Sequence, residues 1–396
     1  MGAKVIVLGG GFAGLAAVGE LARARGVRVQ LIDRRACSTF LPLLPDAISG
    51  RVGAARLLHP LREHCARLGV EFTRAAVHRI VPEHGCVETD AGTFSGDSLI
   101  VCLGCETNFF GDRAAAAHAV GLKSLDEAMR IRDGALKLLG GGPERAAGRR
   151  VVVVGGGYTG FEAASHVLRL LRVQGGWRPE ALREVRPVVL VEKGDQVLGN
   201  CSDRVRQWSV EVVRGFGVDL RAGCSAESFA DGGVTLSDGT ALEEACVIWT
   251  AGVAPGGPCA GLGAPTTPGR RLAVDEFLRV PGAPGVFAAG DVAGPVPSGA
   301  AGPLRMAAQF SLAGGRCAAR NALRSIKGEP LVAFRAPDLG YVVPLAPGAA
   351  AGVVLGREVY GRLPSALHYL MCAFRSWSWQ DRAGVLLDVL TGGKGA

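Results

Sequence analysis

The fold is decided near the start of the chain, by Lys4-Val5-Ile6-Val7-Leu8-Gly9-Gly10-Gly11-Phe12-Ala13-Gly14-Leu15. The β-branched apolar run at residues 5–8 predicts a buried parallel strand. Gly9, Gly11 and Gly14 follow at G-x-G-x-x-G spacing, and the Ala- and Leu-rich residues 15–24 predict a helix. At this spacing the first glycine permits a tight turn, the second lets a pyrophosphate approach the backbone, and the third lets the helix pack closely on the strand. The helix N-terminus then offers free N–H groups to the phosphates.

A carboxylate follows the second strand, at the position where a dinucleotide-binding unit has one. The second apolar run, residues 27–32, predicts a strand that ends at Asp33, about twenty residues after the last glycine. There the carboxylate can accept hydrogen bonds from both hydroxyl groups of an adenosine ribose. A glycine-rich turn alone is weak evidence, and Asp33 alone could be a turn carboxylate. Strand, glycines, helix, strand and acid together predict a dinucleotide-binding unit.

The same pattern returns about 145 residues later. The strand at residues 151–154 is followed by Gly155, Gly157 and Gly160, a predicted helix at 161–171, and a strand at 187–191 that ends in Glu192. Residues 172–186 lie between helix and strand as an insertion. Two fingerprints predict two bound dinucleotides, although the second copy could serve the fold alone. A carboxylate at Glu192 disfavours the 2′-phosphate of NADPH by like-charge repulsion.

The composition limits the classes of protein to which the chain can belong. The chain has 396 residues, enough for two or three domains, with 48% hydrophobic and 20% charged residues, which predicts a large core. Its net charge is +8, but Lys and Arg are scattered, so we expect no nucleic-acid partner. The 11 cysteines are irregularly spaced, and the sequence enters a strand without an apolar leader. We therefore expect reduced thiols in a cytosol-facing protein, and no run of about 18 apolar residues predicts a membrane-spanning helix.

Further elements follow from the hydrophobic pattern. Its periodicity predicts helices at 54–68, 125–139, 306–326 and 365–379, buried strands at 98–104 and 246–252, a strand at 286–291 that ends in Gly290-Asp291, and a proline-rich loop at 39–45. The composition changes after Gly328, where Pro- and Gly-rich loops lead to the last helix and an apolar segment at 385–390.

These residues together resemble the two-dinucleotide flavoprotein reductases, and within them the type II NADH:quinone oxidoreductase family. The motifs that carry the resemblance are Gly9-Gly10-Gly11-Phe12-Ala13-Gly14, Pro42-Leu43-Leu44, Gly155-Gly156-Gly157-Tyr158-Thr159-Gly160-Phe161-Glu162, Trp249-Thr250-Ala251-Gly252, Gly290-Asp291 and Ala308-Gln309. The resemblance covers roughly residues 1–325 and identifies the first fingerprint with FAD and the second with NADH.

The resemblance implies an α/β fold with two Rossmann-like dinucleotide-binding domains, one for FAD and one for NADH, and a small C-terminal α+β or helical segment. The FAD domain would comprise residues 1–115 and 271–326, the NADH domain residues 116–270, and the last segment residues 327–396. The implied reaction takes hydride from NADH to FAD and passes electrons to a quinone, without proton pumping.

The resemblance also assigns site residues. FAD would be bound by Gly9, Gly11, Phe12, Ala13, Gly14, Asp33, Arg34, Pro42, Leu43, Gly104, Gly290, Asp291 and Ala308, and NADH by Gly155, Gly157, Tyr158, Thr159, Gly160, Glu192, Ala251 and Gly252. Glu162 would lie near the nicotinamide, and Gln309 would donate to a quinone carbonyl. The alternatives are a helix-dipole partner for Glu162 and a structural amide for Gln309.

The chain departs from the family at two motifs. The family carries a second Gln where this chain has Ala313, and Ala-Thr-Gly where it has Cys102-Leu103-Gly104. The first departure keeps a ferredoxin- or rubredoxin-reductase-like enzyme open as an alternative, and a non-catalytic nucleotide-sensing protein is the alternative from another class.

Cysteine chemistry is not favoured. Cys37 is followed by Ser38 rather than by a second nearby cysteine, which disfavours disulfide reduction. Cys102 and Cys105 have no companion pair at zinc-site spacing, so neither a metal site nor sulfide oxidation is expected.

The last helix carries apolar residues at helical spacing. They are Leu363, Leu367, Leu370, Met371, Phe374 and Trp377. Such a stripe suits a peripheral contact with the cytoplasmic face of a membrane, or packing in the core or in a homodimer of a cytoplasmic protein.

Overall fold

The computed structural model describes residues 2–230 and 232–392 and divides the chain into two compact units. Unit 1 comprises Met1–Ser38, Leu58–Glu106 and Val253–Pro337. Unit 2 comprises Thr39–Leu57, Thr107–Gly252 and Asp338–Ala396. Both units are therefore assembled from separate stretches of chain.

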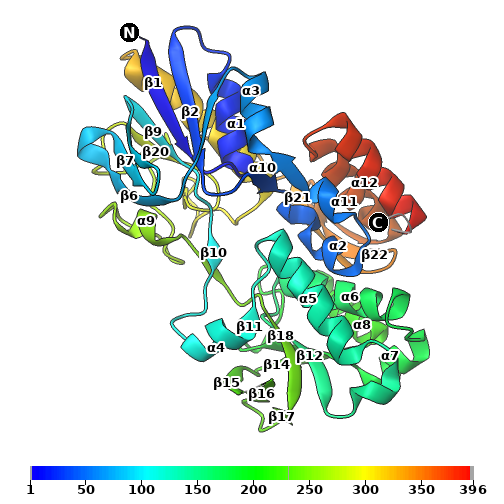
Figure 1. Ribbon diagram of the computed structural model, residues 1–396. Helices are drawn as coiled ribbons and strands as arrows, with labels where there is room; N and C mark the ends of the chain where they lie inside the picture. Colours follow the sequence, from blue (N-terminus) through cyan, green and yellow to red (C-terminus); the bar gives the residue numbers. More distant parts are fainter. Residues whose placement is uncertain (1, 231, 393–396) are drawn as a thin grey trace. The chain divides into compact units, whose positions relative to one another are not determined.

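Unit 1 is built on a five-stranded parallel sheet with the order β20-β9-β1-β2-β5. The strands are β1 (Ala3–Leu8), β2 (Val27–Asp33), β5 (Glu71–Arg74), β9 (Ser98–Val101) and β20 (Val286–Ala288). From β1 the chain runs outward to β2 and β5 on one side, and β9 and β20 pair on the other (Figure 1). The order reverses at β1, and open α/β sheets bind ligands beyond the carboxyl end of the strand at such a point.

Two helices that are distant in sequence pack together beside this sheet. They are α1 (Phe12–Leu21) and α10 (Ala308–Ile326). A Cβ atom at Gly315 would lie 2.0 Å from the backbone oxygen of Ala13, so glycine is required at the crossing of the two helices. A separate antiparallel sheet consists of β6 (Val77–Val81), β7 (Cys86–Thr89) and β8 (Gly92–Ser95).

Unit 2 repeats the same architecture with the strand order β11-β18-β12-β13-β14, all parallel. Its strands are β11 (Ala119–Val120), β12 (Arg149–Val154), β13 (Val188–Glu192), β14 (Val218–Ala222) and β18 (Glu244–Trp249), and its main helices are α5 (Leu125–Leu139), α6 (Tyr158–Val173) and α8 (Asp203–Phe216). The strand β12 precedes the second glycine loop and takes the central place that β1 has in unit 1. The predicted fold class, α/β with two Rossmann-like units, is confirmed.

The end of the chain adds a small α+β segment to unit 2. An antiparallel sheet of β21 (Gly340–Ala346), β22 (Ala349–Val354) and β23 (Arg357–Gly361) is followed by α11 (Arg362–Arg375) and α12 (Trp379–Thr391). The short helix α2 (Leu44–Ser49) packs against α5 and α6. Within the part of the chain that the structure describes, no helix is both long and apolar enough to cross a bilayer.

Three local predictions were wrong. The predicted helix at 365–379 is not continuous, because α11 ends at Arg375 and α12 begins at Trp379, so Trp377 lies between the two helices. Residues 54–68 do not form one helix, but η2 (Ala54–Leu57), β4 (Leu58–Pro60) and α3 (Leu61–Arg67). Pro60 has no N–H to donate, and a proline disfavours helical angles at the residue before it, so the helix begins only after Pro60. The proline-rich stretch at 39–45 is not an open loop either, because η1 (Leu41–Leu43) leads directly into α2.

Candidate functional site

The first glycine loop contains two kinds of glycine. Gly9 has φ +99°, and a Cβ atom there would lie 2.4 Å from the carbonyl oxygen of Cys102. A Cβ atom at Gly14 would lie 1.8 Å from the oxygen of Gly9, so both positions are required by the fold. Gly11 differs, because a Cβ atom there would meet no protein atom within 4 Å. The loop therefore leaves open space at the N-terminus of α1, where a phosphate would lie.

The neighbours of Gly11 are oriented to serve the same space. The side chains of Phe12 and Ala13 are buried in unit 1, so only their backbone can contact a ligand. Asp33 is 6% exposed and accepts hydrogen bonds from the N–H of Gly10 (2.6 Å) and of Arg35 (2.7 Å). The carboxylate thus ties the glycine turn to the end of β2, and each oxygen keeps a further lone pair for a ribose hydroxyl. Arg34 points to the surface and pairs with Glu106 at 2.7 Å.

Unit 2 reproduces this geometry. Gly155 has φ +111°, and its Cβ atom would lie 2.6 Å from the backbone nitrogen of Ala251. A Cβ atom at Gly160 would lie 2.0 Å from the oxygen of Gly155, whereas one at Gly157 would meet no protein atom within 4 Å. The second fingerprint has therefore kept both its close contacts and its open position, which is what a binding loop needs.

The acid of the second unit is also held in the same way. Glu192 accepts hydrogen bonds from the N–H of Gly156 (2.7 Å) and of Gly194 (2.9 Å). The insertion before Glu192 does not displace it, because Trp177 is buried and donates to the oxygen of Leu139 at 2.9 Å. Tyr158 and Thr159 begin α6 beside the open glycine, and Thr159 is exposed.

The Gly290-Asp291 turn lies against the first glycine loop. Gly290 has φ +83°, and its Cβ atom would lie 2.9 Å from the Cβ atom of Ala13. The hydroxyl group of Ser311 on α10 donates to the Asp291 carboxylate at 3.4 Å. Unit 1 thus brings together the two motifs that the sequence assigned to one flavin cofactor.

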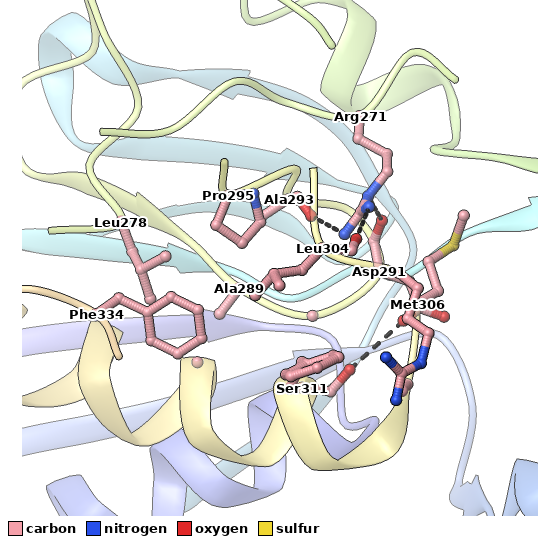
Figure 2. Close-up of a pocket in the computed structure, with 15 residues that line it drawn as sticks. Arg271, Leu278, Ala289, Asp291, Ala293, Pro295, Leu304, Met306, Ser311 and Phe334 are labelled. Carbon is pink, nitrogen blue, oxygen red and sulfur yellow. Dashed lines mark hydrogen bonds between the residues drawn. The ribbon is translucent and has the colours of Figure 1, made fainter. Parts of the chain in front are cut away.

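A cavity opens beside this turn (Figure 2). Its lining combines apolar side chains with a buried guanidinium group and consists of Arg271, Leu278, Ala289, Gly290, Asp291, Ala293, Pro295, Leu304, Arg305, Met306, Ala307, Phe310, Ser311, Gly314 and Phe334. Arg271 donates to the backbone oxygens of Asp291 (3.1 Å), Leu304 (2.6 Å) and Ala293. Burial lowers the pKa of Arg271, and the neighbouring Asp291 acts in the opposite direction. Sequence reasoning missed this residue, which fixes the Gly290-Asp291 turn to the segment before α10.

The other predicted residues of unit 1 surround this turn. Ala308 and Gln309 begin α10, and residues on both sides of them, Ala307 and Phe310, line the cavity. Gly104 has φ +69° and follows β9. The thiol of Cys105 donates to the oxygen of Asp291 at 3.3 Å.

Two predicted contacts lie in unit 2. Pro42 and Leu43 belong to η1, and Leu43 is fully buried there, so only its backbone can face a ligand. The role of both residues in FAD binding stays a prediction.

The cysteines carry no disulfide in the described part of the chain. Burial raises the pKa of the Cys102 thiol to about 12, so this thiol stays protonated at neutral pH. Cys102 is buried directly after β9, so packing at the end of that strand accounts for it.

Glu162 lies in the first turns of α6 and is partly buried. Burial raises its pKa well above the usual range, and the nearby Asp46 raises it further. Asp46 itself was not singled out from the sequence, since its partners Tyr369 and His166 lie far away along the chain and no spacing marks it. Among the described residues, no group of three or more His, Cys, Asp or Glu side chains is arranged to hold a metal ion.

The chain is similar in sequence to known proteins. Residues 3–313 match the family model described as pyridine nucleotide-disulphide oxidoreductase. An NADH dehydrogenase-like protein of Mycobacterium tuberculosis is 32% identical over 363 residues, which cover 88% of this chain and 87% of the relative. A type II NADH:quinone oxidoreductase of the same organism is 30% identical over 315 residues, covering 73% of this chain and 67% of the relative. The corresponding enzyme of Staphylococcus saprophyticus is 26% identical over 370 residues, covering 91% of each.

The fold is also found among solved structures. NDH2 from Plasmodium falciparum in complex with NADH superimposes with a TM-score of 0.84 at 17% identity, covering 100% of this chain and 99% of that one. The sulfide:quinone oxidoreductase of Aquifex aeolicus superimposes with a TM-score of 0.76 at 16% identity, covering 96% and 92%. The chain belongs to the pyridine nucleotide-disulphide oxidoreductase family, and within it to the type II NADH:quinone oxidoreductases.

Proposed function

We propose that the protein is an FAD-dependent NADH:quinone oxidoreductase that takes hydride from NADH and delivers electrons to a quinone without pumping protons. The observation that carries this proposal is the pair of equally built glycine loops, one in each unit. In each loop the fold requires two glycines, and a third glycine borders open space. In each loop a carboxylate also accepts a hydrogen bond from a backbone N–H, that of Gly10 in unit 1 and that of Gly156 in unit 2. The relatives named as type II NADH:quinone oxidoreductases support the same reaction.

Unit 1 would hold FAD, because its residues fit that group. The free N–H groups at the start of α1 and the open space at Gly11 suit a pyrophosphate, and Asp33 and Asp291 suit ribose and ribityl hydroxyls. When bound, FAD supplies the two-electron chemistry, and the protein supplies position and electrostatics. Arg271 keeps the Asp291 turn in place by binding three backbone oxygens.

Unit 2 would bind NADH at the N-terminus of α6. Gly157 leaves space for the pyrophosphate, and Glu192 would accept from the adenosine ribose and disfavour NADPH. The predicted FAD-domain ranges 1–115 and 271–326 and the NADH-domain range 116–270 are part of this proposal.

The quinone would be reduced beside the start of α10. Gln309 would donate its amide hydrogen to the quinone oxygen that gains charge, and the apolar residues around the Asp291 turn would exclude water. Ala313 stands one turn later, where the family has a second Gln, so the quinone would be held by fewer polar contacts.

The C-terminal helices would contact the cytoplasmic face of a membrane. An exposed apolar group on α11 and α12 comprises Leu363 (80% exposed), Leu370, Phe374, Trp379, Leu387 and Leu390. Arg362 and Arg382 are exposed on the same helices and suit anionic headgroups, in keeping with the net charge of +8. The second candidate for this face is the partner in a homodimer. We favour the membrane, because the quinone is dissolved in lipid.

A titration with alternative acceptors tests the reaction. The purified protein should be yellow and should lose its flavin absorbance when NADH is added without oxygen. A quinone should then restore the absorbance, whereas ferredoxin or rubredoxin should not. A colourless protein that binds nucleotides would support a sensor instead of an enzyme.

A further inference from the structure

A buried carboxyl group joins three helices of unit 2. Asp46 on α2 is 2% exposed and accepts a hydrogen bond from the Tyr369 hydroxyl of α11 at 3.0 Å. Its other oxygen lies 3.6 Å from Nε2 of His166 on α6. Nδ1 of His166 in turn lies 2.8 Å from the hydroxyl group of Ser49. Such a network is costly to bury, so its composition calls for an explanation.

A second carboxyl group belongs to the same cluster. Glu162 precedes His166 by one turn of α6 and therefore lies on the same helix face. Glu162 is partly exposed, whereas Asp46 is sealed from solvent, so protons enter and leave the pair at Glu162. Two neighbouring carboxyl groups in a poorly solvated site do not both ionise readily.

The cations around the pair favour charge on Asp46. The Arg51 guanidinium lies 4.2 Å from the centre of the Tyr369 ring, and Arg169 follows His166 on α6. Burial raises the pKa of Asp46, but Arg51 foremost and Arg169 more weakly oppose that rise. For Glu162, by contrast, burial and the neighbouring Asp46 both raise the pKa. The proton of the pair therefore resides on Glu162.

The remaining side chains that face the cluster do not change charge near neutral pH. Burial lowers the pKa of His166 to about 3 and that of His368 to about 4, so both imidazoles are neutral. Burial also raises the pKa of the Tyr369 phenol and of the Cys372 thiol on α11, so both stay protonated. Among the described residues that face the cluster, only the two carboxyl groups can exchange a proton near neutral pH.

We propose that Asp46 and Glu162 share one proton and release it when unit 2 binds the oxidised, positively charged nicotinamide. The inference rests on the proposed function, which puts the nicotinamide dinucleotide at the N-terminus of α6, on the helix that carries Glu162. A nearby positive charge stabilises the carboxylate over the carboxylic acid. Asp46 is a positioning residue in this scheme, since it acts through Glu162.

The step balances with the proposed reaction. The O–H bond of the shared proton breaks, its electron pair stays on the carboxylate oxygen, and the proton leaves to solvent. The hydride of NADH carries two electrons and one proton to the flavin, and reduction of a quinone to a quinol consumes two electrons and two protons. The pair regains a proton from solvent when NAD+ leaves, so it consumes and supplies no net proton over a turnover, and the second proton of the quinol comes from solvent.

The test is the pH dependence of nucleotide binding to the FAD-loaded enzyme. NAD+ must displace the proton, so its affinity should rise by about tenfold per pH unit while the pair is protonated. The redox-inert analogue 1,4,5,6-tetrahydro-NAD has a neutral ring and should bind with little dependence on pH. Glu162→Gln should abolish the slope for NAD+, and Asp46→Asn should move it to lower pH, because Glu162 loses its negative neighbour.

The control is Asp388→Asn. Asp388 is also a buried carboxylate of unit 2, but it pairs with Arg56 at 2.7 Å, so its variant should keep the slope. Equal slopes for NAD+ and the neutral analogue in the wild type would overturn the proposal, as would a slope that persists in Glu162→Gln. A protein that binds neither nucleotide would instead contradict the proposed function itself.

Discussion

At the scale of single residues, the glycines that border open space are the main evidence for dinucleotide binding. We predict that Gly11→Ala folds normally but purifies with little FAD, because its Cβ atom meets no protein atom and enters only the space for the pyrophosphate. Absorbance at the flavin band relative to protein, with a thermal melt, measures both effects.

Gly19→Ala on the same helix is the matched control. A Cβ atom at Gly19 also meets nothing within 4 Å, and alanine should stabilise a helix interior by about 0.5–1 kcal/mol. This variant should keep its FAD. If Gly11→Ala is as yellow as Gly19→Ala, the phosphate does not lie at this loop.

The carboxylate of unit 2 should set the choice of nucleotide. Glu192→Gln removes the negative charge while keeping the size of the side chain, so we predict that KM for NADH rises by about tenfold, the value of a hydrogen bond to a charged group. KM for NADPH should fall relative to that for NADH, because the repulsion of its 2′-phosphate is lost. Parallel changes in both constants would mean that Glu192 serves only the turn at Gly156.

Sequence reasoning succeeded where the chemistry is local. Gly9, Gly14 and Asp33 were found because a tight turn, a close helix approach and a strand-end acid leave a fixed spacing. Arg271 and Asp46 were missed because their partners lie far away in the sequence and obey no spacing. His166 offered a faint signal, one turn after Glu162 on a predicted helix.

At the scale of elements, the C-terminal helices make a separate prediction. The double variant Phe374→Ser, Leu390→Ser should weaken co-sedimentation with anionic vesicles severalfold, since each exposed apolar side chain contributes to interfacial burial. NADH-to-dye activity and the melting temperature should stay unchanged.

The matched control is Leu68→Ser, an exposed leucine of unit 1 at 37% exposure. Deleting α11 and α12 is the poorer experiment, because it would also remove Tyr369 from Asp46 and Asp388 from Arg56. Vesicle binding that is equal in the double variant and in the control would contradict a membrane contact. Dissociation of a dimer in the double variant would assign this face to a second copy.

Long periodic elements were predictable from sequence, and short ones were not. The predicted helix at 125–139 is observed as α5 with the same bounds, since Ser124 caps it and Gly140 ends it. The prediction of one helix at 54–68 was wrong because the helix-like apolar pattern continues through Pro60. Such a pattern does not take into account that proline lacks the N–H that a helix needs. The segment 44–49 is a helix because it packs against α5 and α6.

At the scale of the whole molecule, electron entry and electron exit should be separable. We predict that Gln309→Leu reduces its flavin with NADH at a normal rate but passes electrons to a quinone roughly 10²-fold more slowly, the usual cost of removing one such donor. Stopped-flow absorbance resolves the two half-reactions. If both half-reactions of the variant run at the wild-type rates, Gln309 is a structural amide. The acceptor would then be a protein, or a quinone bound at another site.

Anaerobic single-turnover absorbance of the purified holoenzyme tests directly whether electrons pass from NADH through FAD to a quinone. Stoichiometric NADH should bleach the flavin band, and a stoichiometric quinone added next should restore it fully, because the proposed reaction takes hydride from NADH to FAD and passes the electrons on to the quinone. A flavin that NADH does not bleach, or that stays bleached in the presence of the quinone, would rule out an NADH:quinone oxidoreductase.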